Sequence, residues 1–156
     1  MSQKPEARVQ ELHLTLPNPP KPMAKYKPAV LVGNMLYVSG HGPLKPDGKL
    51  IEGRLGADMN LQQGKDTARV VGLAILATVR NTLGSLDRVK RLVKTLGMVN
   101  CTADFKEQPQ VINGFSELMA EVFGDDAGVG ARSAVGMGSL PGGIAVEVEA
   151  IFRVND

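Results

Sequence analysis

The sequence has little of the material that forms disulfide frameworks, zinc sites or base-stacking surfaces. Its 156 residues include one cysteine, two histidines and no tryptophan, and aromatic residues make up 4%. A single cysteine cannot form a disulfide within the chain, which is typical of proteins from a reducing compartment. One cysteine and two histidines also cannot supply a zinc site of the common Cys/His type. We therefore expect no bound metal.

Charge of one sign and long apolar runs are scarce as well. The formal net charge is +2, which is too small to indicate an electrostatic nucleic-acid binder, and the few aromatic residues offer few stacking platforms. No apolar run reaches transmembrane length, and the opening MSQKPEARVQELHL lacks the apolar region of a secretory signal. We expect a cytoplasmic protein with neither nucleic acid nor membrane as a partner.

What is present is the composition of one ordinary globular domain. Apolar residues make up 43% of the chain, its length suits a single domain, and no internal repeat is visible. Residues 1–22 form a polar N-terminal segment that ends in the proline-rich connector PNPPKP. We expect residues 1–11 to be mobile, residues 12–16 to form a short strand, and residues 23–156 to form the domain.

Hydrophobic periodicity predicts an α+β domain with elements in the order β-β-α-β-α-β-β. Asn60 can cap the first helix and Gly84 can end it. The third strand is apolar on both faces, which indicates that another subunit covers one of them. The sheet should be mostly antiparallel, with both helices on one face. We expect strands at 28–32, 35–39, 89–101, 131–140 and 144–154, and helices at 61–83 and 109–123.

The last two predicted strands place charged residues beside very small ones. If they form a hairpin around the PGG turn, facing residues share one side of the sheet. Small residues beside charges favour a pocket or a contact with a neighbouring chain, although an ion pair between Arg132 and Glu149 would explain the same pattern. Arg132 and Glu147 would lie roughly 13 Å apart, which points to a site at a subunit boundary. The shared face carries Arg132, Ala134, Gly136, Gly138, Glu147 and Glu149.

Two segments resemble the signature of the RidA/YjgF family, whose older names are endoribonuclease L-PSP and translation initiation inhibitor. They are ARSAVGMGSLPGGIAVEVEAI near the end and YKPAVLVGNMLYVSG near the start, and the likeness extends over residues 23–154. The resemblance implies a chorismate-mutase-like α+β protomer. It also implies a homotrimer around a central barrel, with intersubunit clefts and no cofactor.

The same resemblance implies hydrolysis of reactive 2-enamine and 2-imine intermediates to a 2-keto acid and ammonia. In this interpretation Arg132 binds the substrate carboxylate, because a planar guanidinium offers two parallel donors. Glu147 orients or activates the attacking water, and the Tyr26 hydroxyl bonds to the substrate. The implied substrate-binding positions are Ser39, Gly40, His41, Asn113 and Ala134.

Two other functions stay open at this point. An RNA-directed endoribonuclease or translation inhibitor would need a cationic surface, which the charge does not favour. A non-catalytic trimer that binds small ligands or acts as a chaperone fits two departures from the family pattern. Ala134 stands where many members have cysteine, and His41 where many have glutamine.

Overall fold

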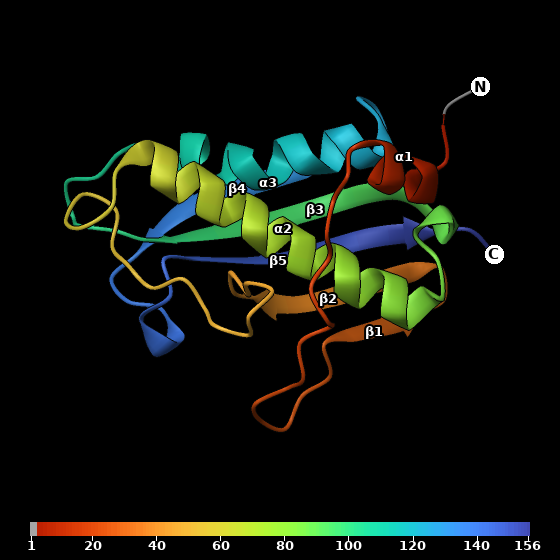
Figure 1. The fold of residues 1–156 in the computed structure, drawn as a ribbon, viewed down its shortest axis with the longest axis horizontal. Helices are drawn as coiled ribbons and strands as arrows, with labels where there is room; N and C mark the ends of the chain where they lie inside the picture. The colour runs from red at the N-terminus through yellow and green to blue at the C-terminus, as the bar shows by residue number, and fades with distance from the viewer. Residues whose placement is uncertain (1–2) are drawn as a thin grey trace.

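The structure is a computed structural model that describes residues 3–156. It confirms the α+β class: a five-stranded sheet carries helices on one face (Figure 1). The sheet order is β1-β2-β5-β3-β4, and all pairings are antiparallel except that of β4 with β3. The strands are β1 (Ala29–Val32), β2 (Met35–His41), β3 (Val89–Asn100), β4 (Ala131–Met137) and β5 (Val146–Val154).

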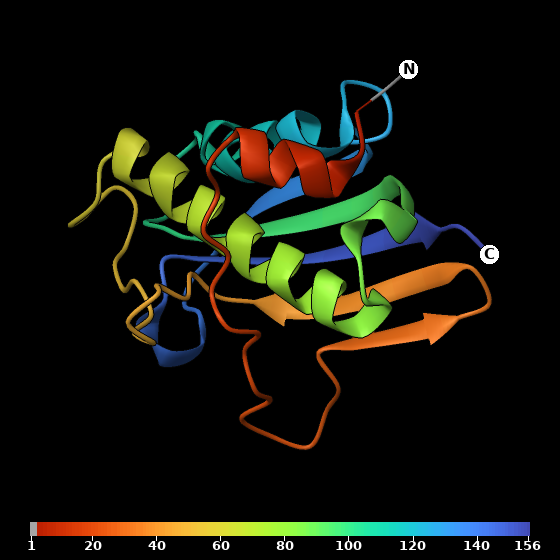
Figure 2. The same ribbon diagram turned by 45° about the vertical axis from the view of Figure 1, so that its right-hand side comes forward.

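Two long helices, α2 (Leu61–Leu83) and α3 (Gln108–Phe123), lie side by side on that face (Figures 1 and 2). The Asn60 side chain accepts a hydrogen bond from the Gln63 N–H and so caps α2, and Gly84 ends it in the left-handed conformation at φ 84°. The predictions for this helix are thus confirmed at both ends. No described helix has the length and apolar character to cross a membrane.

The N-terminal segment is a correction to the sequence predictions. Residues 5–11 form the helix α1 (Pro5–Glu11), with proline in its first turn. The Glu6 carboxylate accepts hydrogen bonds from the Arg80 guanidinium at 2.6 and 3.1 Å and from the Leu86 N–H at 2.8 Å, which ties α1 to the domain. No strand forms at residues 12–16, because their leucines pack against the core instead of pairing with the sheet.

The predicted terminal hairpin is wrong. Strands β4 and β5 do not pair, because β3 lies between them. Strand β3 is twelve residues long and pairs with β5 along one edge and with β4 along the other, so the chain after β4 crosses β3 through the short helix η2 (Pro141–Gly143) before β5 begins. Arg132 therefore lies beside Thr95 of β3, and its side chain contacts α3. Glu147 lies beside Met98, on the opposite face.

The core lies between the helices and the sheet, and the other face of the sheet is open. Phe115 of α3 and Phe152 of β5 are among its fully buried side chains. Within residues 3–156, no element covers the opposite face. That face exposes Val30, Tyr37 and Val135, each by more than a third of its surface.

Candidate functional site

Arg132 lies on the edge strand β4, with its side chain held by α3. Its guanidinium donates hydrogen bonds to Asn113 Oδ1 at 2.7 Å and Ser116 Oγ at 3.2 Å. No carboxylate of residues 3–156 lies within ion-pair distance of it. These residues line a small pocket of about 230 Å³, with the buried Thr95 beside them. A guanidinium fixed by neutral oxygens keeps its remaining donors for an anion such as a carboxylate.

Ser39 and Gly40 form a bulge at the end of β2. Val38 pairs with Ala150 and His41 with Val148, so two residues of β2 face one residue of β5. A side chain on Gly40 would displace the Glu147 carboxylate, so glycine lets that carboxylate lie against the bulge. The Ser39 hydroxyl donates to the Lys27 carbonyl at 2.6 Å and ties the bulge to the loop that carries Tyr26.

Glu147 projects from the open face of β5 beside this bulge. Among residues 3–156 no side chain forms a hydrogen bond or ion pair with it. Partial burial raises the pKa of the Glu147 carboxyl, and the negative charge of Glu149 raises that pKa further. Such a carboxylate takes up a proton more readily than an exposed one, which suits a general base.

His41 supports the bulge from behind. It is 5% exposed, and its Nδ1 lies 2.6 Å from the Ser39 carbonyl while Nε2 lies 2.7 Å from the Thr78 hydroxyl. Because a carbonyl can only accept, Nδ1 carries the proton, and Nε2 accepts from Thr78. Burial lowers the pKa of His41, although the bond to Ser39 opposes this effect. The ring thus positions the bulge, and both its nitrogens are already used.

The residues predicted from the sequence fall into two groups. Asn113 and Ala134 lie with Arg132 on the helix-covered face. The second group is Tyr26, Ser39, Gly40, His41 and Glu147. Strand β3 separates the two groups, and Arg132 and Glu147 project from opposite faces of the sheet. One protomer therefore cannot bring them to a single small substrate.

Sequence reasoning missed three polar residues of this region. Ser116 and Thr95 lie beside Arg132, and Thr78 holds His41. Ser116 follows Asn113 by three residues, so helical spacing alone places both on one face of α3. Thr95 and Thr78 had no such signal, since their roles depend on strand pairing and on the crossing of α2 over β2.

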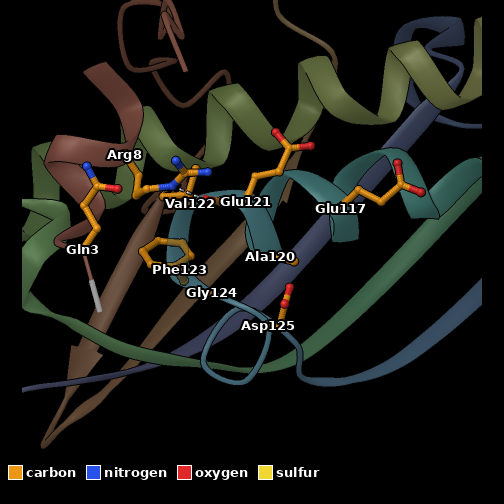
Figure 3. Close-up of a pocket in the computed structure, with 9 residues that line it drawn as sticks. All are labelled: Gln3, Arg8, Glu117, Ala120, Glu121, Val122, Phe123, Gly124 and Asp125. Carbon is orange, nitrogen blue, oxygen red and sulfur yellow. Dashed lines mark hydrogen bonds between the residues drawn. The ribbon is translucent and has the colours of Figure 1, made fainter. Parts of the chain in front are cut away.

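Another hollow of about 650 Å³ lies between α1 and α3, and it contains none of the predicted residues (Figure 3). Most of its charged groups are already paired. Arg8 bonds to Glu11 and to the Glu121 carbonyl, Glu121 pairs with Arg69, and Glu117 pairs with a lysine. Among the described residues that line this hollow, Asp125 is the one carboxylate without an ion pair, and it is exposed to solvent.

The fold and the two groups of polar residues define an α+β protein of chorismate-mutase-like architecture. A family model described as "YjgF/chorismate_mutase-like, putative endoribonuclease" matches residues 6–141. The chain belongs to this family.

Several relatives agree with the assignment. Protein TCP17 of Trypanosoma cruzi is 41% identical over 96% of this chain and 94% of its own length. The crystal structure of a protein of unknown function from Agrobacterium tumefaciens is 38% identical, with a TM-score of 0.87 over 97% of this chain and 92% of that one. RidA from an Antarctic Psychrobacter is 27% identical, with a TM-score of 0.63 over 88% of this chain and 94% of that one.

Proposed function

We propose that this protein is a hydrolytic deaminase of 2-enamine and 2-imine intermediates, which it converts to a 2-keto acid and ammonia. The observation that carries the proposal is Arg132, a guanidinium fixed by Asn113 and Ser116 with no carboxylate partner. Its free donors suit the carboxylate of a small acid. Kinship with RidA supports the same reaction.

The proposed chemistry needs a positioned water and one proton shuttle. The iminium carbon is electrophilic, so water adds to it while Glu147 takes a proton from that water. Glu147 then returns the proton to the nitrogen, and the C–N bond breaks while the hydroxyl formed from the water gives its proton to Glu147 and becomes the ketone. The departing ammonia takes that proton from Glu147 and leaves as ammonium. A carboxyl with a raised pKa accepts the proton more readily than an ordinary carboxylate and can still return it.

We place this site between protomers. Arg132 and Glu147 project from opposite faces of one sheet, so a second protomer has to bring its Glu147 group to the first protomer's Arg132. The exposed apolar side chains of the open face, such as Tyr37 and Val135, supply a surface for assembly. A closed homotrimer with three equivalent clefts meets both conditions.

The test is an assay of imine hydrolysis. An amino-acid oxidase generates the imine, and release of keto acid is followed with and without the protein. We expect Arg132→Ala to lower kcat/KM by at least about 100-fold, since it removes a charged, bidentate contact. Arg54→Ala is the control, because Arg54 is a half-buried arginine whose side chain, within residues 3–156, donates only to the Gly138 carbonyl. An Arg132→Ala variant as active as the parent would contradict the proposal.

RNA cleavage is the second candidate, because relatives carry the endoribonuclease description. It would need a group that activates a ribose hydroxyl next to a phosphate-binding surface. If RNA cleavage persisted through purification and were lost in Arg132→Ala, it would displace the deaminase proposal.

A further inference from the structure

An apolar groove opens beside the Ser39–Gly40 bulge. Its volume is about 630 Å³, and its lining comes from three separate stretches of chain, residues 18–28, 40–50 and 141–144. Lys21 is the one charged side chain among the described residues that line it. The apolar walls include Pro19, Pro20, Pro22, Leu44, Leu50 and Ile144.

The groove meets the reacting end of the proposed site. Tyr26 and Gly40 both line it, and Gly40 packs directly against the Glu147 carboxylate. A substrate whose reacting carbon lies beside Glu147 is therefore separated from the groove only by Gly40. In the arrangement proposed above, the substrate carboxylate binds Arg132 of a second protomer, so the substrate side chain is the part left to occupy the groove.

Two aliphatic side chains narrow the groove around Gly42. A Cβ atom at Gly42 would lie 3.1 Å from Ile144 Cδ1 and 3.3 Å from Leu50 Cδ2. Ile144 is 5% exposed and forms a fixed wall, whereas Leu50 is 40% exposed and faces solvent when the groove is empty. An apolar ligand that covered Leu50 would remove that surface from water.

We propose that the groove binds the substrate's own side chain, and that the preferred substrates are 2-imino acids with large apolar side chains, of the leucine, methionine or phenylalanine kind. The inference rests on the deaminase function proposed above. A methyl group would leave most of the volume unfilled, whereas each further methylene buried against these walls favours binding by about fourfold. The prolines favour this use, because rigid rings lose little entropy when a ligand covers them.

The experiment compares imines made from leucine, phenylalanine and alanine by the same amino-acid oxidase. We expect kcat/KM for the leucine- and phenylalanine-derived imines to exceed that for the alanine-derived imine by about 10-fold or more. Leu50→Asn should reduce this ratio to about one, because a polar amide replaces the apolar wall. Leu31→Asn is the matched control: Leu31 is 43% exposed on β1 but does not line the groove, so the ratio should stay as in the parent.

Binding of the products separates failure of this inference from failure of the proposed function. Calorimetry measures the affinity for 4-methyl-2-oxopentanoate and for pyruvate in the absence of turnover. Hydrolysis with no preference for large side chains would overturn the groove inference and leave the deaminase intact. The opposite result is no hydrolysis of any imine, together with tighter binding of the larger oxo acid and loss of that preference in Leu50→Asn. It would overturn the deaminase proposal and keep the groove as an apolar ligand site.

Discussion

Two charged groups in this protein have opposite surroundings. Arg132 is an exposed cation fixed by neutral oxygens of Asn113 and Ser116. Glu147 is a partly desolvated anion that lies against Gly40 and near Glu149. The first arrangement favours binding of an anion, and the second favours uptake of a proton. The partial burial of the Glu147 charge also costs the fold some stability, whereas Arg132 stays exposed to solvent.

We predict that Glu147→Gln lowers kcat for imine hydrolysis by about 100-fold or more and raises Tm at neutral pH. The folded-state pKa of Glu147 lies above its ordinary value of 4.5. Between these two pKa values the folded protein binds more protons than the unfolded chain, so stability falls as pH rises through this window. Glutamine carries no charge, so it removes the loss of stability that comes from burying the ionised Glu147 carboxylate. The difference in Tm should therefore vanish below about pH 4, under the unfolded-state pKa, and grow as the pH rises through the raised folded-state pKa.

Glu149→Gln is the control for this substitution. It removes the neighbouring charge that raises the pKa of Glu147 but leaves the base in place. The acid limb of the pH–rate profile should move to lower pH, with kcat at neutral pH close to that of the parent. If Glu147→Gln lowered Tm at pH 7, burial of the charge would not be the destabilising term that we infer.

Helix α3 approaches both α2 and β3 closely at positions occupied by glycine. At Gly114 a side chain would collide with the Lys65 carbonyl, so α3 and α2 touch through their backbones. At Gly97 a Cβ atom would lie 2.6 Å from the Ile112 side chain, so α3 also lies tight against β3. These contacts set the depth at which α3 presents Asn113 to Arg132.

We predict that Gly114→Ala destabilises the protein by about 1–3 kcal/mol. Alanine would favour an isolated helix by about 1 kcal/mol, but the collision is with backbone, which cannot rotate away. Urea unfolding measures the change. Gly138→Ala is the control, because no atom lies within 4 Å of its added Cβ, and its stability should stay within about 0.5 kcal/mol of the parent. Unchanged or higher stability of Gly114→Ala would show that the helices do not touch there.

At the scale of the whole molecule, the order of the strands divides the site. Arg132 is on the edge strand β4, and Glu147 is on β5 across β3 and on the other face. An assembly that pairs these groups between protomers makes one complete site from two incomplete ones. Activity should then depend on association, and dilution below the dissociation constant should abolish it.

Subunit mixing tests this division. Arg132→Ala and Glu147→Gln are each expected to be inactive alone. When equal amounts are unfolded and refolded together, about one quarter of the clefts would combine an intact Arg132 with an intact Glu147 from a neighbour. The mixture should recover about that fraction of parent activity. Recovery of no activity, with mixed oligomers shown by mass spectrometry, would place both residues in one protomer's site.

The sequence alone predicts those structural elements whose formation depends on residues close together in the chain. The span and caps of α2 follow from residues 60–84, because capping and hydrophobic periodicity act within a few turns. The β1–β2 hairpin follows from its Gly33-Asn34 turn for the same reason. The helix α1 was missed, because its seven residues carry one buried apolar side chain and depend on Glu6 reaching Arg80 across the fold.

The sequence by itself determined the order and type of the main elements, the family, and the residues Arg132 and Glu147 as chemical candidates. Only the tertiary structure decided that β3 enters between β4 and β5, and therefore that these two residues face away from each other. The physical reason is that the most stable strand pairing depends on segments that lie far apart in the sequence. When β3 lies between β4 and β5, the backbone groups on both of its edges form hydrogen bonds, and the stability gained there outweighs the local preference of the chain for a hairpin at Pro141–Gly143.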